Sequence, residues 1–162
     1  MAKNKEEKTN VMRVLEQKKI AYTPHSYPHE EGIAVDGVTV AQSMGFDPAI
    51  VFKTLVARGA SKQYYVFDVP VAENLDLKKA AKAVGEKSIE MIHQKELLPL
   101  TGYVHGGCSP VGMKKLFPTV FHETAENLET MIVSAGKIGY QVELAPHDLA
   151  ALVRATFADL IA

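Results

Sequence analysis

A chain of 162 residues, 47% hydrophobic and 23% charged, has the size and composition of one folded domain, so we expect residues 1–162 to form a single domain. The formal net charge of −1 excludes a global positive field for nucleic acid, so any contact with RNA should be local or depend on a partner that supplies the affinity. One cysteine excludes an intramolecular disulfide, and no apolar run reaches the ~18 residues of a membrane span. These features predict a cytoplasmic protein that does not bind a membrane.

The first 50 residues are predicted to form short helices around one extended segment. Apolar residues at helical spacing predict a helix over 9–19, whereas two prolines within 22–29 exclude a helix there and favour extended chain. A second helix is predicted over 38–44 and should end at the glycine that follows it. Asp47 then precedes a proline, which predicts a very short helix with the aspartate as its N-cap.

Strands predominate from residue 51 onward. The β-rich runs 51–57 and 64–69 flank turn residues and predict a hairpin, which a helix over 76–84 follows. The remaining predicted elements are, in order, a strand over 87–91, a helical turn over 95–98, strands over 119–122, 131–134 and 140–144, a helix over 146–153 and an apolar tail over 156–161. Strands and helices do not alternate strictly, so we expect an α+β fold with a mixed, strongly curved sheet flanked by helices.

Lys53 is the residue that most invites a functional interpretation. Strand alternation places it on one face with Leu55, while Phe52 and Thr54 take the other face. An ammonium group is costly to bury on either face of a two-sided sheet. Lys53 therefore either reaches solvent from an edge strand or points into a pocket, where it would bind an anion or a polarised carbonyl.

Two segments of small residues are further candidates for a site. In the segment 106–112, the adjacent glycines Gly106 and Gly107 would let backbone N–H groups approach a ligand closely. A tight turn between strands is the alternative, and the spacing is not that of a phosphate-binding P-loop. The second segment, 134–139, follows a predicted strand and marks either the mouth of a cavity or a plain turn.

The sequence offers little for a metal centre or a thiol nucleophile. His25 and His29 are four residues apart, but the prolines beside them exclude the helix that would bring them together. We therefore expect neither a metal nor another cofactor. Cys108 is expected to be a small buried hydrophobic residue, since a reactive thiolate needs a nearby base or positive field.

Taken together, several segments resemble one family. They are, in chain order, residues 25–27, 51–55, 75–85, 101–103, 106–110, 134–137 and 142–144. In this order and combination they resemble the YbaK/EbsC proteins, free-standing relatives of the editing domain of bacterial prolyl-tRNA synthetase, over nearly the whole chain. The resemblance implies a barrel-like mixed sheet with surrounding helices.

The resemblance also implies a set of site residues. Lys53 occupies the position of the family's essential lysine, and Gly106 and Gly107 belong to the loop that would hold the aminoacyl ester with it. The residues expected to bind substrate are Tyr27, Phe52, Thr54, Ser109, Pro110, Ser134 and Gly136. Relatives often carry an aliphatic residue at the position of Cys108, and Gln141 stands where some have an aspartate.

The implied activity is removal of cysteine from mischarged proline tRNA, with the substrate's own thiol as the attacking group. The implied partners are the acceptor end of proline tRNA and prolyl-tRNA synthetase. Three alternatives stay open on the sequence alone: release of another small amino acid such as alanine, a non-catalytic module that binds a nucleotide-like ligand or a protein, and a metalloenzyme.

Overall fold

The computed structural model describes residues 8–30 and 33–162. Its strands are β1 (Thr23–Ser26), β2 (Phe52–Gly59), β3 (Tyr64–Pro70), β4 (Ile89–Met91), β5 (Thr119–His122), β6 (Met131–Ser134), β7 (Tyr140–Leu144) and β8 (Thr156–Ala158). Its α-helices are α1 (Asn10–Gln17), α2 (Gly37–Met44), α3 (Leu77–Val84), α4 (Gln94–Thr101) and α5 (Pro146–Val153). Turns of 3-10 helix cover η2 (Pro48–Ile50) and η3 (Glu123–Asn127).

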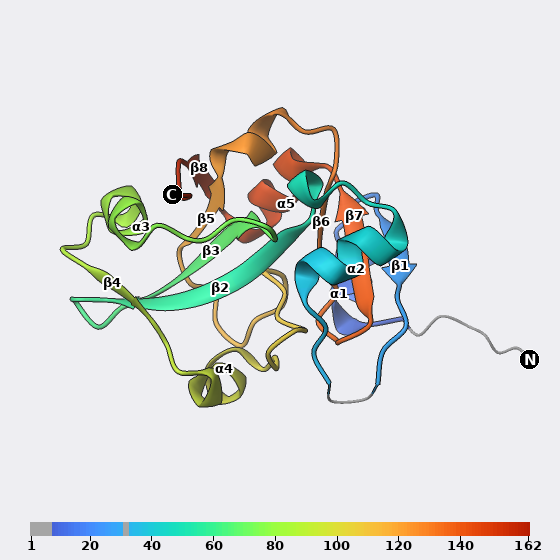
Figure 1. The fold of residues 1–162 in the computed structure, drawn as a ribbon, viewed down its shortest axis with the longest axis horizontal. Coiled ribbons are helices and arrows are strands. Elements are labelled where there is room, and N and C mark those ends of the chain that lie inside the picture. Colours follow the sequence, from blue (N-terminus) through green and yellow to red (C-terminus); the bar gives the residue numbers. More distant parts are fainter. Residues whose placement is uncertain (1–7, 31–32) are drawn as a thin grey trace, which may run out of the picture.

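The strands form two sheets, as Figure 1 shows. Three antiparallel strands have the order β1-β7-β6, and five strands have the order β4-β2-β3-β5-β8. In the larger sheet β2 is antiparallel to β3 and β4, whereas β5 is parallel to β3 and β8. Val51, just before β2, forms a parallel bridge with Ile132 of β6 and so joins the two sheets. The predicted α+β fold with a mixed sheet is confirmed.

Local signals placed the helix boundaries well. The side chain of Asp76 accepts hydrogen bonds from the amides of Lys78 and Lys79, and α3 ends at Gly85 in the left-handed conformation. Asp47 caps η2 in the same manner, and α2 ends at Gly45. None of the helices in the described part of the chain is long and apolar enough to cross a membrane.

Two elements differ from their predictions. The predicted turn over 95–98 is part of α4, which continues through Pro99 to Thr101. The proline removes one hydrogen bond, to the carbonyl of Lys95, and that residue is exposed, so water can replace the bond. The predicted apolar tail contains β8, whose pairing with β5 completes the edge of the larger sheet. That pairing joins segments more than 30 residues apart, so local patterns do not indicate it.

The hairpin of β2 and β3 is covered on both faces. One face packs against α3 through a cluster that includes Ala57, Phe67 and Ala80. The opposite face packs against α4 and the segment after it through a cluster that includes Val56, Leu97 and Cys108. In Figure 1, α3 and α4 lie on opposite sides of this hairpin. The smaller sheet packs against α1 and α5 around the side chains Leu15, Phe121, Val133, Leu144 and Leu149.

Candidate functional site

The first half of β2 leaves one edge open between two attachments. At one end Val51 bridges to β6, and at the other end β4 pairs with residues 57–59. No strand in the described ranges pairs with the stretch between them. The carbonyl of Val56 points to the β4 side, where it accepts a hydrogen bond from the amide of Ile92 at 3.4 Å. Because main-chain direction alternates along a strand, the backbone of Thr54 faces this open edge.

Lys53 lies half-buried within this stretch. Its cross-strand neighbour is Val69, and it shares a face with Leu55, as alternation predicted. Burial lowers the pKa of its ammonium group, while the carboxylates of Asp36 and Glu73 act in the opposite direction. Asp36 is the N-cap of α2, so the start of that helix lies beside the lysine. The ammonium group is thus partly desolvated and only partly neutralised, which suits it to bind an anionic or polarised oxygen.

Thr54 points to the other face, where it contacts a buried acid. Its hydroxyl oxygen lies 2.5 Å from Oδ1 of Asp68, its cross-strand partner on β3. Asp68 is completely buried, and burial raises the pKa of its carboxyl group to about 7 although the hydrogen bond with Thr54 lowers it. The predicted site residue Thr54 is therefore hydrogen-bonded to an acid, Asp68, whose pKa lies near neutral pH.

The glycine loop packs between two other segments. A Cβ on Gly106, which has φ +89°, would lie 2.7 Å from Cβ of Ala34, and a Cβ on Gly107 would lie 3.0 Å from the amide nitrogen of Ile138. Only glycines allow this close approach without displacement of a neighbour. The loop therefore contacts both the segment before α2, which flanks Lys53, and the turn between β6 and β7. The amide of Gly107 is already used, since it donates to the carbonyl of Val104 at 3.0 Å.

The residues that follow the two glycines are buried and anchor the loop to the core. Cys108 is 7% exposed, and burial, with the nearby Asp68, raises the pKa of its thiol to about 12. The thiol is therefore neutral, as expected for a structural cysteine. Ser109 is fully buried, and its hydroxyl accepts a hydrogen bond from the amide of Val111. Pro110 is also buried and lines a separate cavity of about 150 Å³, between residues 110–119, α1 and α5.

Tyr27 and the turn after β6 lie together. The amide of Tyr27 donates to the carbonyl of Gly139 at 2.8 Å, and its side chain is 8% exposed. The hydroxyl of Ser134 accepts a hydrogen bond from the amide of Gly136, which shapes the turn. A Cβ on Gly136 would lie 2.9 Å from the ring of Tyr103, so the ring packs directly on this backbone. Tyr27, Ser134 and Gly136 thus lie in two neighbouring segments, next to the glycine loop.

Phe52, like Ser109, is a predicted substrate-binding residue whose side chain is buried in the core. Its ring is 3% exposed and belongs to the core cluster with α1 and α5. Phe52 can therefore shape a site only indirectly, by packing against the residues that form it.

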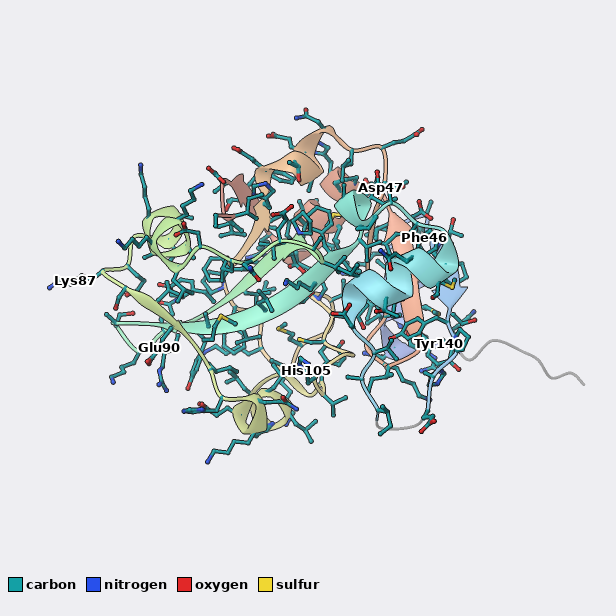
Figure 2. The ribbon with its side chains drawn as sticks, in the orientation of Figure 1. Phe46, Asp47, Lys87, Glu90, His105 and Tyr140 are labelled. Atoms are coloured by element: carbon teal, nitrogen blue, oxygen red, sulfur yellow. The ribbon has the colours of Figure 1, made fainter. Side chains whose placement is uncertain are left out.

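Two exposed side chains, His29 and Lys137, and the partly buried Tyr140 lie beside Tyr27. Nδ1 of His29 is 2.9 Å from the carbonyl oxygen of Tyr27, and the rings of His29 and Tyr140 have their centroids 5.6 Å apart. The ammonium group of Lys137 lies 5.6 Å from the centroid of the Tyr140 ring. Figure 2 labels Tyr140, the first residue of β7, and His105, which directly precedes the two glycines in the chain. Such groups can stack on bases and attract phosphates.

The described residues do not form a metal centre. Within residues 8–30 and 33–162, no three His, Cys, Asp or Glu side chains are placed to hold a metal ion. His25 instead pairs with Glu143 at 2.8 Å.

Sequence reasoning missed two acids of this region, Asp36 and Asp68. Asp68 carried a usable signal, since it interrupts an otherwise apolar strand, and the hairpin register predicts that it faces Thr54. Asp36 carried no such signal, because its proximity to Lys53 depends on the path of the chain before α2.

The chain is similar to known proteins in sequence and in fold. Residues 34–152 match the family model of the aminoacyl-tRNA editing domain. The chain belongs to this family. A relative from Enterococcus faecalis (strain ATCC 700802 / V583), with the name "Putative Cys-tRNA(Pro)/Cys-tRNA(Cys) deacylase EbsC", is 45% identical over 161 residues, which cover 99% of this chain and 98% of the relative.

Solved structures share the fold of this editing domain. The crystal structure of a protein described as a "putative trans-editing enzyme for prolyl tRNA synthetase" superposes with a TM-score of 0.79, at 26% identity over 94% of both chains. A hypothetical protein superposes with a TM-score of 0.81 at 18% identity, over 93% of this chain and 97% of the other. The second likeness concerns the fold alone.

The contact between Gly106 and Ala34 can be tested by substitution. We expect Gly106→Ala to push apart the loop and the segment that flanks Lys53, and so to reduce deacylation of an aminoacyl-tRNA by about tenfold or more. Gly85→Ala is the matched control, because Gly85 also has a positive φ but a Cβ there meets nothing within 4 Å. Steady-state rates and thermal unfolding of both variants check this. Equal effects of the two substitutions on the rate would contradict it.

Proposed function

We propose that this chain is a trans-editing deacylase that removes cysteine from mischarged Cys-tRNA(Pro). The observation that carries the proposal is the 45% identity, over nearly the whole of both chains, to a relative whose name gives that activity. The membership of the editing-domain family and the half-buried position of Lys53 on β2 support it. The reaction is expected in the cytoplasm, where aminoacyl-tRNAs are used.

Lys53 is proposed to hold the tRNA 3′ end or its ester. A half-buried ammonium group interacts more strongly with an anionic oxygen than an exposed one, because water screens it less. The backbone of Thr54 and the loop at Gly106 would contact the ester from either side. The exposed ring of His29 and the partly buried ring of Tyr140, with Lys137 beside them, would supply local contacts to RNA in a chain whose net charge is −1.

The attacking group is proposed to be the substrate's own thiol. Attack of the cysteine sulfur on its ester carbonyl forms a C–S bond, breaks the C–O bond to the tRNA and leaves a cyclic thioester, while the tRNA 3′ oxygen takes the proton. Cys108 does not supply this nucleophile, because burial keeps its thiol neutral. An activated ester needs mainly positioning and charge stabilisation, which the described site can offer.

The role of Lys53 predicts a large loss of activity on its removal. We expect Lys53→Ala to lower the rate of deacylation of cysteinyl-tRNA(Pro) by roughly 100-fold or more, the usual cost of losing one group that stabilises a developing charge. Lys82→Ala, at an exposed lysine of α3, is the control and should leave the rate unchanged. Single-turnover assays on folded proteins measure both. A folded Lys53→Ala protein with wild-type activity would sink the proposed role.

The proposed nucleophile predicts a preference between two isosteric substrates. Serine differs from cysteine by one atom and is a much poorer nucleophile, so seryl-tRNA(Pro) should be released far more slowly than cysteinyl-tRNA(Pro). Alanyl-tRNA(Pro) in the same assay tests the sister specificity for small amino acids. Equal rates for the cysteine and serine esters would instead indicate attack by water.

A partner is proposed to supply the choice of tRNA. The site described above can contact the acceptor end, which different tRNAs share, and the near-zero net charge leaves little field to hold the rest of a tRNA. Prolyl-tRNA synthetase is the proposed partner, since it produces the mischarged proline tRNA.

This division of labour predicts weak discrimination by the isolated chain. We expect it to deacylate cysteinyl-tRNA(Pro) and cysteinyl-tRNA(Cys) at similar rates, and expect added prolyl-tRNA synthetase to favour the proline tRNA. Competition between the two substrates, with and without the synthetase, measures this. Strong preference for proline tRNA by the isolated chain would show that the partner is not needed.

A further inference from the structure

Asp68 is a buried acid that the packing of the core does not require. It lies in the middle of β3, is 0% exposed, and its Oδ2 is buried without a hydrogen-bond partner in the described part of the chain. Its Oδ1 has one partner, the hydroxyl of Thr54 at 2.5 Å. An incompletely paired buried carboxyl group is costly, and a valine would fill a similar volume without that cost. Such a group is a candidate for function.

The protonation state of Asp68 depends on its burial and on its hydrogen bond with Thr54. On its own face of the sheet, the titratable group that interacts with it is the thiol of Cys108, which stays neutral because its pKa is about 12. Its neighbour on β5 is Phe121, which cannot titrate. Lys53 and His122 point to the opposite face, since their strand positions alternate with Thr54 and Phe121. The phenol of Tyr103 interacts with Cys108 and is also neutral, with a pKa of about 12.

The number of hydrogens shared by Asp68 and Thr54 depends on the state of the acid. When Asp68 is protonated, the pair has two hydrogens: the acid donates one to the Thr54 oxygen, and the hydroxyl hydrogen is free to turn toward the open edge of β2. When Asp68 is ionised, the pair has one, and the carboxylate holds it because a charged acceptor binds a hydroxyl strongly. The Thr54 hydroxyl can then accept hydrogen bonds but cannot donate one outward.

We propose that Asp68 is a positioning residue whose protonation lets the Thr54 hydroxyl donate a hydrogen bond to the aminoacyl ester. This inference rests on the proposed deacylase function. Thr54 is half-buried on the strand that also carries Lys53, so a hydroxyl turned to the open edge lies beside the proposed ester site. In this arrangement the lysine and the hydroxyl approach the ester from the two faces of one strand.

The direction of the pH effect follows from the state that donates. Burial raises the pKa of Asp68 to about 7, so the donating state is filled below this pH and is lost above it. Asp68→Asn carries a permanent N–H donor and no titrating proton, so it should hold Thr54 in the donating state at every pH. The variant is nearly isosteric and removes a buried ionisable group, so it should fold.

The test compares deacylation of cysteinyl-tRNA(Pro) by wild type and Asp68→Asn in single turnover from pH 5.5 to 8.5. Uncatalysed hydrolysis is subtracted from both rates. Their ratio then does not depend on the ionisation of the substrate, which affects both proteins equally. We expect a constant ratio at low pH and a variant that gains on wild type above about pH 7, by about tenfold per pH unit. A carbon-13 titration of the Asp68 carboxyl group should show its midpoint near the same pH.

Variants of Thr54 show whether the effect passes through the hydroxyl. Thr54→Ser keeps a hydroxyl and should keep the pH dependence, whereas Thr54→Val keeps Asp68 but should lose it. The Thr54 pair also decides the matter if Asp68→Asn does not fold. An active wild type with a flat ratio, or a pH dependence that survives in Thr54→Val, overturns this inference and leaves the proposed function intact. A wild type that deacylates no aminoacyl-tRNA overturns both.

Discussion

The pairing of β2 determines where a site can exist in this fold. Its start bridges to the smaller sheet at Val51, its end pairs with β4, and one long side pairs with β3. The stretch between the two attachments is held in extended conformation, and none of the described strands pairs with its outer side. Backbone groups there are fixed in direction but not used in pairing between the described strands, a combination that a fully paired central strand or a mobile loop does not provide.

The rest of the candidate site is held against this stretch by close backbone contacts. Gly106 meets Ala34, Gly107 meets Ile138, and Tyr27 bonds to Gly139, so three loops distant in sequence fix one another. These contacts exclude side chains, which explains why the glycines appear as pairs and small-residue runs. The helices α3 and α4 cover the hairpin on both faces and keep it from bending away.

Local chemistry made much of this structure predictable. Asp47, Asp76 and Gly85 each act on neighbours within a few residues, so the helices they bound were found from the sequence. The place of Lys53 on its strand followed from alternation. The pairing of β8, the proximity of Asp36 to Lys53 and the burial of Ser109 and Phe52 depend on distant segments, and a single sequence carries no signal for them. Pro99 suggested that the helix would end before it, but a helix of two turns tolerates one missing hydrogen bond near its end.

The burial of Cys108 has a consequence for an enzyme that handles a substrate with a free thiol. A thiolate beside such a substrate would exchange with oxidised cysteine or glutathione and become blocked as a mixed disulfide. The Cys108 sulfur is shielded by the loop above it and carries its proton at any physiological pH, so it is a poor partner in that exchange. The same loop that forms part of the candidate site therefore also protects the single cysteine of the chain from thiol exchange.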